Sequence, residues 1–346
     1  MEQSTLKRFY LITYPRTCSN LLVRMLGIHQ QPNMTTGDEL DGNRFLPAFT
    51  SMGPNGLVGK DFGQWTEDEK AQMKQEYQDC FDRLLPVLNT AAAEGKTVFM
   101  KEHIGCLVES AKLSNQAASF SANNIHPTAQ PEWVVTAKND SGAGSSHTNT
   151  TVLPDDFLQS WYPTFIIRHP ARAYPSYLRI LEETHWTDAS IPEDSIDIWS
   201  EGIMTLRWTR QLYEWYAAYF KHQAQIETQV PVWPIILDAD DIMRDPKVVM
   251  NYAQILGLDT SKVSFSWKAA EKQQVEKMDP YAKRFLSTLL DSKNVEQNKI
   301  AGNVDLENET RAWRGEFGEK KAGELKALVC AAMEDYEFLK TRRLRA

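Results

Sequence analysis

The chain has 346 residues, of which 42% are hydrophobic and 24% are charged, so it can bury a large core and has the composition of a globular protein. Its 38 basic and 46 acidic side chains give a formal net charge of −8, which argues against general affinity for nucleic acid or an anionic membrane. Any bound anion would have to be held by a local basic cluster.

The four cysteines, at positions 18, 80, 106 and 330, are widely scattered and form no CxxC pair. This pattern favours reduced thiols in a cytoplasmic protein over a zinc site or a disulfide framework. The sequence contains no run of 18 apolar residues and no apolar signal segment at its start. We therefore expect neither nucleic acid nor a membrane as a partner, and the sequence leaves the oligomeric state open.

The first predicted element is a short buried strand that begins at Tyr10, followed by a turn and then a helix with apolar residues at Leu21, Leu22, Met25 and Leu26. Pro15 ends the strand, and Thr17 and Ser19 are candidate helix caps. Backbone N–H groups at the start of this helix, beside the charge of Arg16, predict an anion site. The GxxxxGKS/T pattern of nucleoside-triphosphate P-loops is absent.

Strands and helices alternate along the rest of the chain. Further strands are predicted at 97–100, 164–167 and 234–237. Helices are predicted from the capping box at Thr66 to Gly95, and over 174–181, 194–222, 246–256 and 322–339. Residues 29–64 and 105–160 are irregular. This alternation predicts an α/β fold of three layers, αβα, with a central, mostly parallel sheet.

Basic residues follow three of these strands directly. Arg16 follows the first strand, Lys101 and His103 follow the second, and Arg168 follows the third. Because ligands of parallel sheets collect outside the carboxyl ends of the strands, we expect these side chains to share one site.

The residues around these strand ends resemble sulfotransferases that use 3′-phosphoadenosine 5′-phosphosulfate (PAPS), with a P-loop NTPase-like fold. Thr13-Tyr-Pro-Arg-Thr-Cys-Ser-Asn20 is similar to their TYPKSGTT loop, and Lys101-Glu-His103 to their KTHLP strand end. Arg168-His-Pro170 through Ser176 resembles their RNPxDxxxSxY segment, with the same spacing from Arg to Ser. Two further segments, Leu237–Pro246 and Arg314–Gly318, resemble the YEDL…DP junction and the KGxxG part of the RKGxxG loop. The whole chain more loosely resembles fungal members, several of which act in natural-product pathways.

The resemblance implies a role for each matching residue. Residues Arg16, Thr17, Cys18, Ser19 and Asn20 would hold the 5′-phosphosulfate. Arg168 and Ser176 would hold the 3′-phosphate, for which an arginine fork is well suited, and Arg314 and Gly315 would close over the same phosphate.

His103 is the predicted general base, since an imidazole suits the removal of a proton from an attacking alcohol. Lys101, two residues away on the same strand, would neutralise developing charge, as would Arg16. His185 is a rival base, and we interpret His169 as structural. These basic groups suffice without a metal. We expect Asp238, Asp240 and Asp241 to cap helices and form ion pairs rather than to bind one.

The sequence also departs from the family pattern. Leu21 stands where an aromatic residue usually stacks on adenine, Arg16 replaces the loop lysine, and Cys18 replaces the loop glycine. Trp313 replaces the first basic residue of RKGxxG. The 64 residues between His103 and Arg168 are more than cytosolic members carry, and we expect the segment at about 105–160 to form a lid or acceptor wall within a single domain spanning residues 1–346.

These observations predict transfer of a sulfuryl group from PAPS to a hydroxyl of a small, fairly apolar molecule. The resemblance to fungal members adds the expectation that this acceptor belongs to natural-product biosynthesis. Three alternatives stay open at this point. Sulfation could activate a hydroxyl for elimination or cyclisation, the chain could be a P-loop nucleotide kinase or hydrolase, or it could bind nucleotide without catalysis on the same scaffold.

Overall fold

The structure is a computed structural model that describes residues 7–37, 42–53, 55–57, 60–114, 133–137, 144–184, 196, 198–227 and 232–346. The chain divides into two compact units. The first comprises Met1–Tyr14, Asn33–Phe165 and Ile198–Ile235, and the second comprises Pro15–Pro32, Ile166–Asp197 and Ile236–Ala346.

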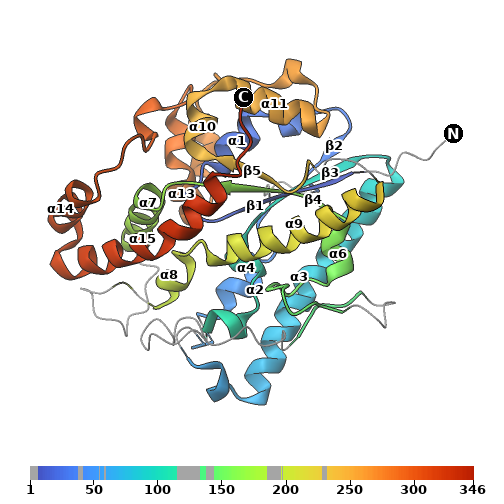
Figure 1. Cartoon of the computed structure of the whole chain (residues 1–346), viewed down its shortest axis with the longest axis horizontal. Helices are drawn as coiled ribbons and strands as arrows, with labels where there is room; N and C mark the ends of the chain where they lie inside the picture. Colours follow the sequence, from blue (N-terminus) through green and yellow to red (C-terminus); the bar gives the residue numbers. More distant parts are fainter. Residues whose placement is uncertain are drawn as a thin grey trace. The chain divides into compact units, whose positions relative to one another are not determined.

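Five strands form one sheet in the order β2-β3-β1-β4-β5. Their bounds are Arg8–Thr13 (β1), Met34–Thr35 (β2), Thr97–His103 (β3), Tyr162–Ile167 (β4) and Ile235–Asp238 (β5). β1 pairs in parallel with β3 and with β4, and these three strands lie side by side (Figure 1). The predicted α/β class with a central parallel sheet is confirmed. β2 was not predicted, because two residues carry no detectable period.

Burial explains why these strands read as continuous apolar runs. Tyr10, Leu11 and Ile12 of β1 have no exposed surface, and neither do Phe165 and Ile166 of β4. A strand covered on both faces needs apolar side chains at successive positions rather than at alternate ones. β1 therefore lies in the interior. Its burial fixes the position at which the turn after Thr13 begins.

The helices of the first unit include one long helix that the sequence predicts well. Thr66 accepts a hydrogen bond from the Glu69 N–H at 3.2 Å, and Glu69 accepts one from the Thr66 N–H at 2.7 Å, so the capping box is confirmed. The helical bounds are Leu46–Ser51 (α2), Glu67–Ala93 (α3), Ile104–Leu107 (α4), Asp155–Gln159 (α6), Ile198–Ile203 (α8) and Arg207–Glu227 (α9), with a 3₁₀ turn at Phe62–Gln64.

The single helix predicted over 194–222 is wrong, because α8 and α9 are separate. The chain leaves α8 after Ile203, and the Thr205 hydroxyl accepts the N–H of Arg207 at 3.2 Å, as a residue before a helix start does. The aromatic stripe of α9 is core, as predicted: Trp208 and Trp215 are both buried. Trp133 and Trp161 are buried as well.

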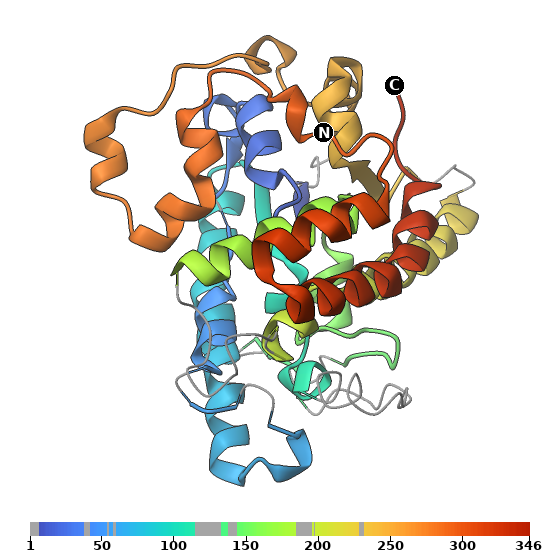
Figure 2. The same ribbon diagram turned by 90° about the vertical axis from the view of Figure 1, so that its left-hand side faces the viewer.

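The second unit is mostly helical. Its helices are Ser19–Met25 (α1), Pro170–Thr184 (α7), Ala239–Arg244 (α10), Pro246–Leu256 (α11), Lys272–Glu276 (α12), Pro280–Asp291 (α13), Leu306–Phe317 (α14) and Glu319–Lys340 (α15), with 3₁₀ turns at Ile28–Gln30, Thr260–Lys262 and Gln297–Lys299. α14 and α15 lie side by side and pack on α7 (Figure 2). α13 packs against α1 and α7.

The aspartates at the end of β5 were predicted to cap helices and form ion pairs, and Asp238 and Asp241 do so. Asp238 accepts the N–H of Asp240 at 2.8 Å and the hydroxyl of Tyr336 at 2.9 Å. Asp240 accepts the N–H of Ala301 at 2.9 Å, and Asp241 pairs with Arg343. Among the residues that the structure describes, no three acidic, histidine or cysteine side chains gather as a metal site requires. Within the same residues, no helix is long and apolar enough to cross a membrane.

Candidate functional site

The turn after β1 has an unusual backbone. Arg16 and Cys18 have φ angles of 68° and 65°, in the left-handed region that residues with a Cβ seldom adopt. Asn43 is the other described non-glycine residue with a positive φ. Such strain persists where the surrounding structure enforces it, often at ligand sites. The left-handed φ of Cys18 fits the glycine that stands at this position of the similar loop, because glycine adopts this conformation without strain.

The helix that follows this turn starts differently from the sequence prediction. Cys18, rather than Thr17 or Ser19, is the N-cap of α1, and it makes no side-chain cap hydrogen bond. The Leu22 N–H donates to the Cys18 carbonyl at 3.0 Å, which closes the first helical turn. An ordinary Ser or Thr cap has extended φ and ψ angles, whereas Cys18 is left-handed, so the backbone enters α1 in a different direction.

Two predicted phosphate-binding residues meet in the second unit. The Arg16 Nε donates to the Ser176 hydroxyl at 3.0 Å, and its Nη1 donates to the Phe285 carbonyl at 2.7 Å. Both accepting groups are neutral. Ser176 lies on α7 and Phe285 on α13, so packing of these helices holds the guanidinium of Arg16 in place.

Arg168 supports the same turn. It is only 8% exposed, and its guanidinium donates to the Arg16 carbonyl at 2.9 Å and to the Lys299 carbonyl at 2.8 Å. The side chain therefore links the turn after β1 with the segment around Lys299. Removing it would free the backbone of Arg16, whose positive φ depends on such support.

Positive charges converge on this turn. Burial, together with the neighbouring charges of Arg168 and Arg284, lowers the pKa of Arg16 to about 10, although Cys18 opposes the change. Arg284, on α13, is held by a bidentate ion pair with Glu183. Like charges that repel one another favour an anion among them, because its charge offsets the repulsion. The sequence analysis did not single out Arg284 or Lys299, since neither follows a strand.

Arg314 and Gly315 are in a different setting from the one the resemblance implies. Both lie within α14 rather than in a loop, and Gly318 is the residue that ends this helix. Arg314 pairs with Glu319 at 2.9 Å and is about half exposed. Their assignment to the 3′-phosphate stays a prediction, whereas the segment beside Arg168 is the one around Lys299.

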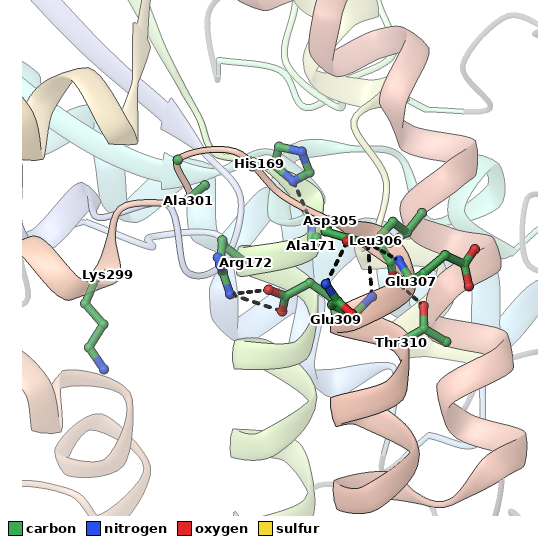
Figure 3. A network of polar contacts seen from close by, with 12 residues as sticks. His169, Ala171, Arg172, Lys299, Ala301, Asp305, Leu306, Glu307, Glu309 and Thr310 are labelled. Carbon is green, nitrogen blue, oxygen red and sulfur yellow. Dashed lines mark hydrogen bonds and ion pairs between the residues drawn. The ribbon is translucent and has the colours of Figure 1, made fainter.

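His169 has a structural setting, as we interpreted it. Its Nδ1 accepts the N–H of Ala171 at 3.2 Å, at the start of α7 (Figure 3). Burial, with the charge of Lys340, lowers the pKa of His169 to about 4, so the ring is neutral near pH 7. Arg172, one turn on, points toward Glu309 and pairs with it at 3.0 Å (Figure 3).

The predicted base lies at the end of β3 in the first unit. His103 is the last residue of this strand and is paired in register with Thr13, the last residue of β1. Its Nδ1 is 2.7 Å from the Thr13 hydroxyl. The rival base, His185, lies outside the described residues.

A buried carboxylate fixes the backbone at this strand end. Glu102 has no exposed surface, and it accepts the N–H of His103 at Oε1 and that of Phe45 at Oε2, each at 3.0 Å. Burial raises the pKa of Glu102 to about 7, although these hydrogen bonds and the charge of Lys101 oppose the rise. This role of Glu102 was not predicted, because a glutamate in a strand usually faces water.

The segment before α2 is pressed against the same strand. The Asn43 N–H donates to the Lys101 carbonyl at 2.9 Å. Gly42 has a φ of 115°, and a Cβ at this position would lie 2.0 Å from the same carbonyl oxygen. Only glycine allows so close an approach. Lys101 itself is buried, with 4% of its surface exposed.

The predicted lid at 105–160 is described only in part. Val108 and Thr151 form an antiparallel bridge, and the Val152 N–H donates to the Leu107 carbonyl at 2.9 Å. The Trp133 N–H donates to Glu109 at 3.2 Å. These contacts join the two ends of the segment, and its role as a lid stays a prediction.

No protein-family model matches the chain. Sulfotransferase ppzF of Metarhizium rileyi is 35% identical over 98% of this chain and 96% of its own length. Sulfotransferase ppzF of Metarhizium majus is also 35% identical, over 98% of this chain and 97% of its own.

Two solved structures are more distant. A sulfotransferase domain from the olefin synthase of Synechococcus PCC 7002 has 15% identity and a TM-score of 0.38, covering 92% of this chain and 96% of its own. A sulfotransferase domain from the curacin biosynthetic pathway has 10% identity and a TM-score of 0.37, covering 91% and 99%. The assignment therefore rests on the two sequence relatives, which span nearly the whole chain. This chain belongs to the sulfotransferase family.

Proposed function

We propose that this enzyme transfers a sulfuryl group from PAPS to a hydroxyl of a small, fairly apolar molecule. The observation that carries the proposal is the turn at Arg16–Cys18, where a left-handed backbone and converging guanidinium groups favour a bound anion. A phosphosulfate supplies that charge without the magnesium ion that a triphosphate requires.

The binding roles follow from the contacts of the second unit. Arg16 and the backbone of residues 17–20 would bind the 5′-phosphosulfate. Arg168 and Ser176 would bind the 3′-phosphate, and both already contact Arg16. In this proposal a phosphate takes over guanidinium N–H groups that otherwise donate to backbone carbonyl oxygens. The exchange is favourable because charge-assisted hydrogen bonds to phosphate are stronger than those to neutral carbonyls.

The proton would leave through His103. Thr13, which contacts it, is three residues before Arg16, so the Cα atoms of these two residues lie no more than ~11 Å apart along the chain. This limit supports a reaction in which the base and the phosphosulfate serve one acceptor. Lys101 would stabilise charge that develops on the transferred group.

Natural-product intermediates are the acceptors that we propose, because this class contains hydroxylated, fairly apolar molecules and the two relatives are fungal. The acceptor would contact segments that the donor does not use, within residues 33–62 and the partly described segment at 105–160. We further propose that the protein acts in the cytoplasm, where thiols such as those of its four unpaired cysteines stay reduced.

Calorimetry with two nucleotides tests the proposal. Adenosine 3′,5′-bisphosphate should bind in the absence of magnesium, whereas ATP should bind at least tenfold more weakly. Mass spectrometry of reactions with PAPS and a panel of hydroxylated acceptors then tests turnover. Failure of the bisphosphate to bind would rule out the proposed donor, and tight binding without any sulfated product would favour a non-catalytic binding protein.

A further inference from the structure

The Thr13 hydroxyl lies between two groups at the ends of β1 and β3. Its Oγ1 is 2.7 Å from Nδ1 of His103 and 3.3 Å from the carbonyl oxygen of Glu102. Thr13 has no exposed surface, so water does not compete for these contacts. A hydroxyl carries one proton, so Thr13 can donate to only one of these two groups.

The two neighbours of the hydroxyl are not equivalent. A carbonyl oxygen can only accept a hydrogen bond, whereas Nδ1 of a neutral imidazole either donates or accepts. Both contacts are therefore hydrogen bonds only when the Thr13 proton goes to Glu102 and the Nδ1 proton of His103 goes to Thr13. The reverse placement sets oxygen lone pairs of Thr13 and Glu102 toward each other at 3.3 Å in a buried position, which is the less favourable arrangement.

The surroundings hold this arrangement in place. The parallel register sets Thr13 opposite His103, and the branched side chain of Thr13 restricts its rotation. The backbone N–H of His103 is bound to the buried Glu102 carboxylate at 3.0 Å, so the carbonyl and the ring belong to one fixed strand end. Neither contact needs a ligand to form.

We propose that Thr13 is a positioning residue that keeps His103 in the Nδ1–H tautomer and so leaves the lone pair on Nε2. The catalytic consequence rests on the function proposed above. The acceptor O–H proton goes to Nε2 while its oxygen forms a bond to sulfur. The bond from sulfur to the bridging oxygen breaks, and its electron pair leaves with the bisphosphate. The imidazolium that results keeps its Nδ1–H bond to Thr13.

The tautomer can be observed without any reaction. The seven histidines are labelled with ¹⁵N. NMR then records long-range correlations between the carbon-bound ring protons and the ring nitrogens, at a pH where the rings are neutral. His103 is assigned by the signal that is lost in His103→Gln. A pattern with Nδ1 protonated and Nε2 unprotonated supports the proposal, and the opposite pattern overturns it.

Two variants of Thr13 isolate the hydroxyl. Thr13→Ala and Thr13→Ser both lose the same methyl group, so they differ from each other by one oxygen atom. We expect Thr13→Ser to keep the Nδ1–H tautomer, and Thr13→Ala to show a mixture of tautomers or the Nε2–H form. If Thr13→Ala keeps the pure Nδ1–H form, the hydroxyl does not set the tautomer. Even if a variant fails to fold, an Nε2–H tautomer in the wild-type spectrum overturns the proposal.

Kinetics then separate the inference from the proposed function. We expect kcat of Thr13→Ala to be about tenfold below that of Thr13→Ser, with KM for the donor within twofold. Equal kcat values in the two variants would show that the tautomer has no catalytic consequence. If wild-type protein shows the Nδ1–H tautomer but binds no adenosine 3′,5′-bisphosphate, the positioning inference stands and the donor assignment falls.

Discussion

The turn at Arg16–Cys18 and the strand end at Lys101–His103 are built in opposite ways. The turn brings guanidinium groups together, binds them to neutral oxygens, and has two residues in the left-handed region. The strand end contains a buried carboxylate that accepts two backbone N–H groups, and a hydroxyl set against a ring nitrogen. The first arrangement suits an arriving charge, and the second suits the transfer of a proton. Changes at the two regions should therefore affect different measurements.

The largest expected effect is on the strand end. His103→Ala should lower kcat by about 10²–10⁴-fold, because the acceptor proton loses its base. Affinity for adenosine 3′,5′-bisphosphate should stay within about twofold of wild type. Stopped assays of sulfated product measure kcat, and calorimetry measures the affinity for the bisphosphate. His185→Ala is the matched control, and a loss of kcat in that variant with normal turnover of His103→Ala would move the base to His185.

The buried carboxylate predicts a dependence of stability on pH. Glu102 has a folded-state pKa of about 7, above its unfolded value of 4.5, so its contribution is fully present below pH 4.5 and is lost as the pH rises toward 7. The loss should reach roughly 3 kcal/mol. Urea unfolding of wild type and Glu102→Gln, between pH 4 and 8, measures it as the difference between the two curves.

The difference isolates Glu102 from other groups. Asp238 has a pKa raised to about 6 and acts in the same direction, while His169, lowered to about 4, acts in the opposite one. Both are present in wild type and in the variant, so their effects cancel. Parallel curves would show that Glu102 is ionised at the same pH in the folded and unfolded chain.

Changes at the turn should alter the affinity for the nucleotide. Arg168→Ala should weaken adenosine 3′,5′-bisphosphate by about 2 kcal/mol, because it removes a charge from the cluster and the support of the Arg16 carbonyl. Calorimetry measures this change. Arg179→Ala, which breaks an exposed ion pair between α7 and Glu316 of α14, is the control and should leave affinity unchanged. Unchanged affinity in Arg168→Ala would move the 3′-phosphate elsewhere.

The smallest effect concerns strain. Cys18→Gly should raise the free energy of unfolding by about 1 kcal/mol, since glycine adopts a φ of 65° without the clash of a Cβ. Cys18→Ala keeps the Cβ and should give no gain, which makes it the matched control. Urea unfolding measures both variants. Equal stability of the two would mean that the turn stores no strain at Cys18.

The elements that the sequence predicted best depend on neighbouring residues. The capping box at Thr66 and the start and end of α11, at Asp245 and Gly257, are set by residues within a few positions. The break between α8 and α9 was missed because its visible signal is one threonine before α9, whose hydroxyl accepts the Arg207 N–H. β2 depends wholly on its pairing with β3, to which its own two residues give no clue.

The same distinction holds for the site: residues marked by their neighbours in the sequence were predicted, and partners from distant positions were not. Strand ends placed Arg16, His103 and Arg168, because basic residues directly after apolar runs stand out in a sequence. Partners from distant positions did not stand out, namely Arg284 beside Arg16 and Thr13 beside His103. The left-handed conformation of Cys18 was missed for the reason that cysteine is not a residue typical of that region.

The most direct test of the anion site compares two nucleotides that differ by one phosphate. Adenosine 3′,5′-bisphosphate and adenosine 5′-monophosphate are titrated into the wild-type protein in a calorimeter, without magnesium. The proposed contacts of Arg168 and Ser176 predict that the bisphosphate binds at least tenfold more tightly, as expected for a charge-assisted phosphate contact. Equal affinities, or no binding of either nucleotide, would contradict the account.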